Sequence, residues 1–149
     1  MRNFGGSSRG TLSLLQATLF SVNTIYAQLA VRVGPAHVVD VAHRMGIRSP
    51  LQPVCSIMLG PEAVAPLEMT VAFATLAARG VRHRPQALRR VSASGGRVIA
   101  RLSRPGRRVL ARSVADRVSH ALAGVVQAGT GRAAYFGRPR PARPERPRT

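Results

Sequence analysis

Apolar residues recur at helical spacing on both sides of a short polar break at residues 20–24. Before the break, leucines fall at positions i, i+3 and i+7, and after it apolar residues fall at i, i+4, i+5 and i+8. Such spacings place side chains on one face of a helix. The pattern therefore predicts two consecutive amphipathic helices, with faces formed by Leu12, Leu15 and Leu19 and then by Ile25, Leu29, Ala30 and Val33.

The break itself carries two hydrogen-bonding side chains, Ser21 and Asn23. On one continuous helix they would sit about 200° apart around the axis. If the chain turns between two helices, both side chains can point into one cleft, and Asn23 is a favourable N-cap residue for the second helix. The break thus indicates a polar feature of an active site, with a plainer alternative in which Asn23 only caps a helix and Ser21 is solvated.

The pattern continues with further helices separated by glycine and proline. Thr11 or Ser13 can cap the first helix, and the second stops at Gly34-Pro35, a glycine stop followed by a proline that starts the next helix. That third helix ends at Gly46, and residues 47–65 are expected to be connecting structure with at most one short helical turn. A strong helix is predicted from Pro66 to Gly80, with its apolar face formed by Leu67, Val71, Ala74 and Ala78.

The C-terminal third predicts a hairpin, one more helix and a tail. Residues 86–91 and 97–102 flank Ala93-Ser94-Gly95-Gly96, and the second run alternates in polarity, which is typical of a β-hairpin. Ser113 with Asp116 resembles a capping box at the start of the last helix, which should end near residues 129–131. From residue 138 the chain alternates arginine with proline, so residues 138–149 are expected to be disordered.

Charge adds a second function class to consider. The 149-residue chain has a formal net charge of +18, and all 23 basic residues are arginine, with no lysine. Such charge suggests a protein that binds nucleic acid or another polyanion. The arginines are scattered, however, and six aromatic residues are too dispersed for a base-stacking platform, so no specific nucleic-acid partner is expected.

Metal and redox chemistry receive little support from the sequence. The histidines have no ligand-like spacing with carboxylates, so no metal or cofactor is expected. The single cysteine, Cys55, cannot form an internal disulfide, and a buried or idle thiol is the expectation. Asp40 and Glu68 lie within helical patterns and are expected to be solvated or paired with arginines.

The flanks of the polar break give a sharper interpretation. The stretch GGSSRGTLSLLQATLFSVNTIYAQLAVRVG resembles the transpeptidase domain of bacterial penicillin-binding proteins, most closely the class A enzymes, whose SxN motif here reads Ser21-Val22-Asn23. The likeness continues in HVVDVAHRMGI, PLEMTVAFATLAARGV, LRRVSASGGRVIA and GVVQAGTGRAA, and the assigned partial domain is residues 1–137. The resemblance implies an α+β fold: an incomplete serine transpeptidase/β-lactamase-like domain, mainly its helical part plus a β-hairpin.

The resemblance implies an acyl-transfer site that this chain only partly contains. The family's domain cross-links peptidoglycan stem peptides through an acyl-serine, and binds β-lactams at the same site. Ser21 would be the proton-relay hydroxyl and Asn23 the substrate-orienting amide, neither being the nucleophile. The family's SxxK and KTG motifs each need a lysine, and the chain has none. We therefore expect this chain to be a fragment of a D,D-transpeptidase that is inactive because the two motifs are absent.

The C-terminal tail suggests an explanation for the absence of one motif. If each codon of RPRPARPERPRT began at the third base of the present one, the chain could read AAGKTGTTQD, which contains the family's KTG motif. A frameshift is therefore a hypothesis that fails if Arg143 is not encoded by AGA or AGG.

The family also implies a location. Its members carry an N-terminal membrane anchor, a glycosyltransferase domain and an extracytoplasmic catalytic domain. Neither a signal peptide nor an apolar run of membrane-spanning length is found in these 149 residues. The expectation is that this chain, expressed alone, would remain cytoplasmic.

The oligomeric state is left open. Apolar faces meant for the absent strands would be exposed, so a marginal, aggregation-prone product is also expected.

Overall fold

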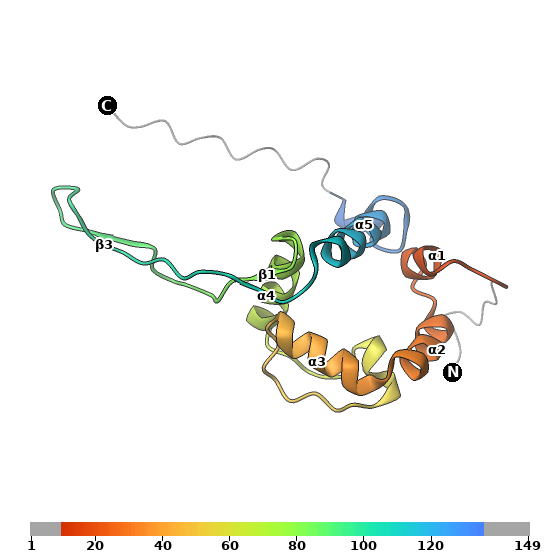
Figure 1. Cartoon of the computed structure of the whole chain (residues 1–149). Coiled ribbons are helices and arrows are strands. Elements are labelled where there is room, and N and C mark those ends of the chain that lie inside the picture. Colours follow the sequence, from red (N-terminus) through yellow and green to blue (C-terminus); the bar gives the residue numbers. More distant parts are fainter. Residues whose placement is uncertain (1–9, 136–149) are drawn as a thin grey trace.

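The computed structural model of the chain describes residues 10–135, and the arginine-proline tail with its proposed frameshift lies outside them. In chain order the elements are α1 (Leu14–Leu19), α2 (Asn23–Val33), α3 (Pro35–Met45), η2 (Cys55–Leu59), α4 (Pro66–Ala77), β1 (Val81–Arg82), β2 (Arg90–Ser92), β3 (Val98–Arg101), β4 (Arg107–Arg108), α5 (Arg112–Ala128) and η3 (Arg132–Ala134). Figure 1 shows the helices arranged as a ring, with α1 beside α5 and α3 on the opposite side.

Of the two residues predicted to cap α1, Thr11 and Ser13, the structure uses Ser13. Ser13 is the N-cap, its hydroxyl accepts from the Gln16 N–H, and the Gln16 side chain reaches back to complete a capping box. This reciprocal arrangement satisfies two donors that a helix start leaves unpaired. The predicted stops also hold at the next two helices: Gly34, with φ of 86°, ends α2, and Pro35 begins α3.

Two predicted caps are wrong. Val22, not Asn23, is the N-cap of α2, and Asn23 is the first helical residue. The backbone N–H of Val22 instead donates to the Ala17 carbonyl at the end of α1, which places the turn one residue earlier. At α5 the N-cap is Ala111 with no side-chain cap, and the Asp116 carboxylate binds Arg79 rather than completing a box with Ser113.

The buried core is small and made mostly of alanine. Ala17, Ala30 and Ala115 are fully buried, and the largest fully buried side chain in the described part is Thr75, which donates 2.8 Å to the Val71 carbonyl of its own helix. The predicted apolar face of α4 is wrong in part, because Leu67 is 61% exposed while Thr75 is buried. Alanine allows close helix contact but removes little apolar area from water.

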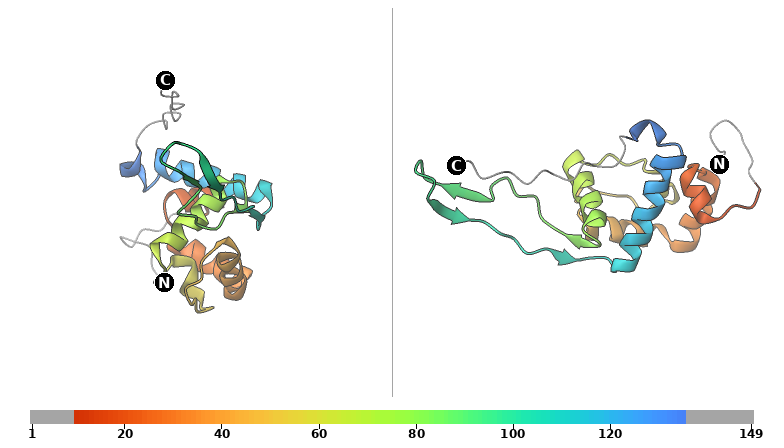
Figure 2. Two further views of the ribbon diagram at one scale, coloured as in Figure 1. Left: turned by 90° about the vertical axis from the view of Figure 1, so that its left-hand side faces the viewer. Right: turned by 90° about the horizontal axis from the view of Figure 1, so that it is seen from above.

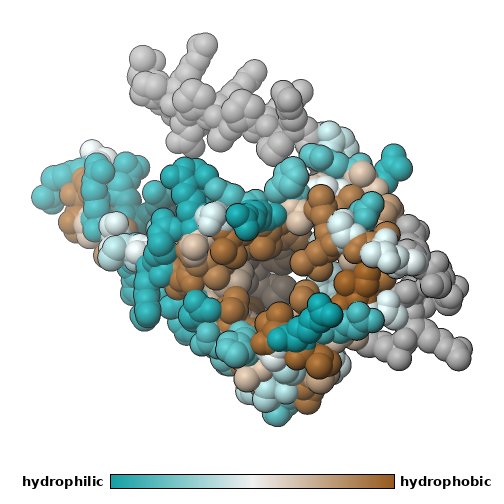
Figure 3. Space-filling view, turned by 45° about the vertical axis from the view of Figure 1, so that its right-hand side comes forward, coloured by the Kyte–Doolittle hydropathy of each residue, from teal (hydrophilic) through white to brown (hydrophobic). Residues whose placement is uncertain are grey.

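Large apolar side chains remain on the surface. Figure 3 shows brown, hydrophobic residues surrounding a hollow between the helices. Exposed large residues occur on α1, α4 and α5, among them Leu14, Leu15, Phe73, Val114 and Val118. Soluble proteins rarely leave this much contiguous apolar surface uncovered.

The strands form a long arm of two short ladders rather than a central sheet. The predicted hairpin is confirmed, with β2 antiparallel to β3 and a bulge between Val91 and Ser92. A second ladder, β1 with β4, was not predicted, since each strand has only two residues. The right-hand view in Figure 2 shows this arm projecting from the helices. Helices with a small antiparallel arm agree with the predicted partial α+β domain.

Candidate functional site

The turn between α1 and α2 places Ser21 in a conformation that a serine adopts at a cost. Its N–H donates to the Thr18 carbonyl, and the N–H of Val22 donates to the Ala17 carbonyl. This is the Schellman arrangement that closes helix C-termini, in which the central position is usually glycine. Ser21 occupies that position with φ of 51°. A non-glycine residue held there, where a glycine would be relaxed, is a feature that clusters at functional sites.

The Ser21 hydroxyl meets a second hydroxyl from the far end of the described chain. Ser21 Oγ lies 3.1 Å from Thr130 Oγ1, and either atom can donate. The Thr130 N–H also donates to the Leu19 carbonyl at 3.1 Å, which fixes the backbone of the two segments together. Thr130 was not predicted as a site residue, although it lies in the family-like segment GVVQAGTGRAA.

Gly129 makes the close approach between the ends of α1 and α5 possible. A Cβ added at Gly129 would lie 2.3 Å from the Leu19 carbonyl oxygen, a contact that real side chains do not make. At Gly124, five positions earlier and within α5, an added Cβ would lie 3.2 Å from Leu19 Cδ1, a looser contact with a side chain. The end of α5 can therefore lie directly against the end of α1 only because residue 129 has no side chain.

Asn23 lies two residues beyond Ser21, at the first position of α2. Its side chain is half-buried. No hydrogen bond joins Ser21 to Asn23 within the described residues. The turn between them agrees with the prediction that the chain does not continue as one helix. Thr18 Oγ1 on α1 lies 2.6 Å from the Tyr26 hydroxyl on α2, which holds the two helices in a fixed relation around the turn.

The charged groups that perturb each other lie away from this turn. Arg79 donates two hydrogen bonds to Asp116 and so joins the end of α4 to α5. This hydrogen bonding lowers the pKa of the Asp116 carboxyl and raises the pKa of Arg79. Glu68 accepts from the hydroxyl of Ser49 at 2.7 Å and from its N–H, and those bonds lower the pKa of Glu68. Asp40 pairs with Arg44 one turn along α3, as expected.

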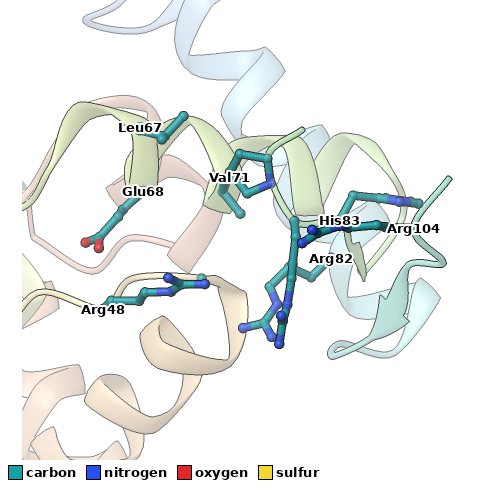
Figure 4. A pocket seen from close by; sticks show the side chains of 10 residues that line it. Arg48, Leu67, Glu68, Val71, Arg82, His83 and Arg104 are labelled. Atoms are coloured by element: carbon teal, nitrogen blue, oxygen red, sulfur yellow. The ribbon is translucent and has the colours of Figure 1, made fainter. Parts of the chain in front are cut away.

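A cavity of about 470 Å³ lies elsewhere, between the α3 end, α4 and the base of the arm. Figure 4 shows Arg48, Arg82 and Arg104 around it, with Glu68 on the α4 side. Arg82 Nη1 donates to the carbonyls of His43 and Arg44, so this arginine stabilises the end of α3. The cavity and the Ser21 turn are separate features.

Metal chemistry has no support in the described part of the chain. Among residues 10–135, no group of three or more histidine, cysteine or acidic side chains could hold a metal ion. Cys55 is exposed, so of the two expected alternatives, a buried or an idle thiol, the buried one is wrong. None of the helices in that range is both long and apolar enough to cross a bilayer.

Comparison with known proteins gives a consistent result. The family described as "Penicillin binding protein transpeptidase domain" matches residues 2–140. Penicillin-binding protein 1A of Mycolicibacterium smegmatis is 31% identical over 95% of this chain and 20% of its own length. Penicillin-binding protein 1A of Mycobacterium tuberculosis is 31% identical over 80% of this chain and 17% of its own length. The chain therefore spans a fifth or less of these relatives.

Solved structures share the fold over most of the chain. The D,D-transpeptidase domain of a peptidoglycan glycosyltransferase from Eggerthella lenta superposes with a TM-score of 0.72 at 26% identity, covering 91% of this chain and 42% of that one. The Mycobacterium tuberculosis PonA1 protein, solved in complex with penicillin V, gives a TM-score of 0.72 at 31% identity, over 85% of this chain and 39% of that one.

Proposed function

The chain belongs to the penicillin-binding protein transpeptidase family, and from this premise we propose that it supplies the middle part of a peptidoglycan D,D-transpeptidase site. In this proposal Ser21 and Asn23 belong to the substrate and proton-relay side of the site. The nucleophilic serine and the lysines that assist acylation come from sequence that these residues do not include.

The observation that carries the proposal is the Ser21 hydroxyl in its left-handed turn, 3.1 Å from the Thr130 hydroxyl. A serine hydroxyl can donate one hydrogen bond while accepting another. It can therefore receive a proton from one group and deliver a proton to a second. Thr130 would orient that hydroxyl, and the Asn23 amide would hydrogen-bond the substrate peptide.

The chain lacks the lysine that this chemistry requires. A serine is a weak nucleophile until a neighbouring base removes its proton. The family uses lysine for that step, and this sequence contains none. We infer that the chain alone neither reacts with β-lactams nor cross-links stem peptides, because the remaining polar groups have no activated nucleophile to assist.

The exposed apolar surface supports an incomplete domain. The hydrophobic hollow in Figure 3 and the exposed side chains of α1, α4 and α5 are suited to packing against further structure. In the intact family that structure includes the central sheet. The same proposal places the complete protein at the membrane with its catalytic domain outside the cytoplasm.

A frameshift in the tail is part of the proposal. The nucleotide sequence tests it: codons of residues 139–148 should read AAGKTGTTQD from their third base, with AGA or AGG at Arg143. A different arginine codon at that position removes the shifted lysine and ends the frameshift explanation.

A chimera tests the function itself. Residues 10–135 would replace the matching segment of the 31%-identical M. tuberculosis PonA1 transpeptidase domain, and acylation by a labelled penicillin would be followed. We expect the chimera to be labelled, the chain alone not to be labelled, and Ser21→Ala in the chimera to slow acylation by about 100-fold or more, the contribution of a positioned proton-transfer group.

Ser92→Ala is the matched control, since this exposed serine lies on β2 in the arm. Equal labelling of the Ser21→Ala and Ser92→Ala chimeras would show that the Ser21 hydroxyl has no role in acylation. Labelling of the chain alone would overturn the inferred inactivity.

A further inference from the structure

Among residues 10–135, the arm formed by residues 81–108, here called the arginine ribbon, is the most highly charged part. It carries nine arginines and neither aspartate nor glutamate. Gln86 holds its two halves together, because Gln86 Nε2 donates to the carbonyls of Leu88 and Leu102. The ribbon extends away from the helices, so most of its length has no protein on either side (Figure 2).

Arginines face each other across both ladders of the ribbon. Arg90 is the cross-strand partner of Arg101, and Arg82 is the partner of Arg107. Like charges at directly opposite positions destabilise a strand pair. Two ribbon arginines donate to backbone carbonyls, Arg82 at the end of α3 and Arg108 at Arg79 and Leu110. The other seven guanidinium groups have no hydrogen-bond partner among residues 10–135.

Carboxylates elsewhere do not neutralise this charge. Asp40 is paired with Arg44 and Asp116 with Arg79, and among residues 10–135 no ion pair joins a carboxylate to a ribbon arginine. The ribbon therefore presents uncompensated positive charge that an external anion would stabilise, by relieving the repulsion within each arginine pair.

The ribbon also exposes aliphatic side chains among the arginines. Leu88 is 60% exposed, Ile99 is 61% exposed, and Val91, Val98 and Leu102 are exposed as well. Arg90 and Arg101 lie on one face, while their neighbours Val91 and Ala100 form a pair on the other, because side chains alternate along a strand. The ribbon thus combines cationic and aliphatic groups on a surface with no packing partner.

We propose that the arginine ribbon binds the surface of a bilayer containing anionic phospholipid. Guanidinium groups match phosphate geometry and are weakly hydrated. Aliphatic side chains gain by insertion at the acyl boundary, and basic residues are drawn to anionic headgroups. The ribbon contains no phenylalanine, tyrosine or tryptophan, so it lacks the large aromatic platforms on which proteins stack successive bases of single-stranded nucleic acid.

Vesicle binding by the full 149-residue chain tests the proposal. The probes are phosphatidylcholine vesicles with and without phosphatidylglycerol, and a short DNA duplex of random sequence. The ribbon variant is Arg90→Gln with Arg101→Gln. The matched control is Arg32→Gln with Arg117→Gln, which removes the same charge from exposed positions on α2 and α5.

We expect the ribbon variant to weaken binding to anionic vesicles roughly 30-fold, at about fivefold for each arginine near the membrane. The control should weaken binding several-fold less, and vesicles without anionic lipid should not bind. Equal losses in the two variants would show that the net charge alone drives binding and would overturn the proposal.

A fluorescence variant tests insertion directly. The chain has no tryptophan, so Ile99→Trp provides one emitter on the ribbon, and Val31→Trp places a control emitter at a 70% exposed position on α2. Emission from position 99 should shift to the blue with anionic vesicles, while emission from position 31 should not.

Leu88→Ser with Ile99→Ser separates lipid from nucleic acid. This variant should weaken vesicle binding while leaving DNA binding unchanged, because only lipid uses the aliphatic groups. Unchanged vesicle binding, together with tighter binding to DNA than to vesicles, would identify a nucleic-acid surface and overturn the lipid assignment.

Discussion

Ser21 and Thr130 share a hydrogen bond of 3.1 Å although 109 positions separate them in the sequence. The bond joins the turn after α1 to the end of α5, and the Thr130 N–H reinforces it by donating to Leu19. Two hydroxyls from opposite ends of the described chain thus meet at the serine that the SxN motif singles out.

Ser21→Gly should not destabilise the chain, although it removes a hydrogen bond. The position has φ of 51°, which glycine adopts freely, and a non-glycine residue there costs on the order of 1 kcal/mol. We expect the free energy of unfolding by urea to be unchanged or raised by up to about 1 kcal/mol. Ser21→Val should lower it, since a β-branched residue is disfavoured at this φ. A large loss of stability in Ser21→Gly would mean that the hydroxyl serves the fold.

Gly129→Ala and Gly124→Ala should have opposite effects. A methyl group at 129 would lie 2.3 Å from the Leu19 carbonyl oxygen, whereas one at 124 would lie 3.2 Å from a movable Leu19 methyl. We expect Gly129→Ala to destabilise by about 1–3 kcal/mol as an overpacked site does. Gly124→Ala, inside α5, should be neutral or stabilising by up to about 1 kcal/mol through helix propensity. Urea denaturation followed by circular dichroism measures both, and equal effects would contradict the close approach of α1 and α5.

Asp116→Asn should reduce the dependence of stability on acid pH. The hydrogen bonds from Arg79 lower the folded-state pKa of Asp116 below the ordinary carboxyl value of 3.8. The pair therefore contributes stability above the unfolded pKa, and that contribution is lost as pH falls through 3.8 and on through the lower folded pKa. When thermal unfolding is measured from pH 6 to pH 2, the unfolding temperature should fall less steeply with decreasing pH in the variant. Asp40→Asn, which removes an exposed pair along α3, is the control and should leave the slope nearly unchanged.

Leu67→Gln with Phe73→Gln should reduce self-association. Both side chains lie on α4 and are more than half exposed, at 61% and 54%. Exposed apolar patches favour aggregation, so light scattering of the purified chain should fall in the variant. Thr70→Gln, on the same helix, changes no large apolar side chain and should scatter like the unsubstituted chain. Undiminished scattering in the double variant would show that α4 is not a contact surface.

Local signals in the sequence predicted most helices but not their contacts. Ser13, Gly34 and Pro66 mark element boundaries through backbone chemistry that acts within a few residues. The predicted caps Asn23 and Ser113 are wrong for two different reasons. The Val22 N–H closes the C-terminus of α1 by donating to the Ala17 carbonyl, a local bond, whereas Asp116 accepts from Arg79, which lies 37 residues away. Local propensity gives no information about partners that lie tens of residues away.

The same limit applies to the site and to the arm. Ser21 and Asn23 were predicted from the motif, but Thr130 was missed because nothing between residues 21 and 130 encodes their distance. The ladder of Val81–Arg82 with Arg107–Arg108 was missed because two-residue strands have no periodicity. The α4 face was misjudged at Leu67, since the sequence does not show which part of the domain would cover it.

The position of Thr130 so late in the chain has a consequence for synthesis. Closing a loop of 109 residues has a length-dependent entropic cost of about 4 kcal/mol, whereas α2, α3 and α4 form contacts over shorter separations. At about 5–20 residues per second, a ribosome needs roughly 5–20 seconds to add Thr130 after Ser21. During that interval α1 cannot dock, so the nascent chain is most vulnerable to chaperones, proteases and neighbouring copies before its last helix emerges.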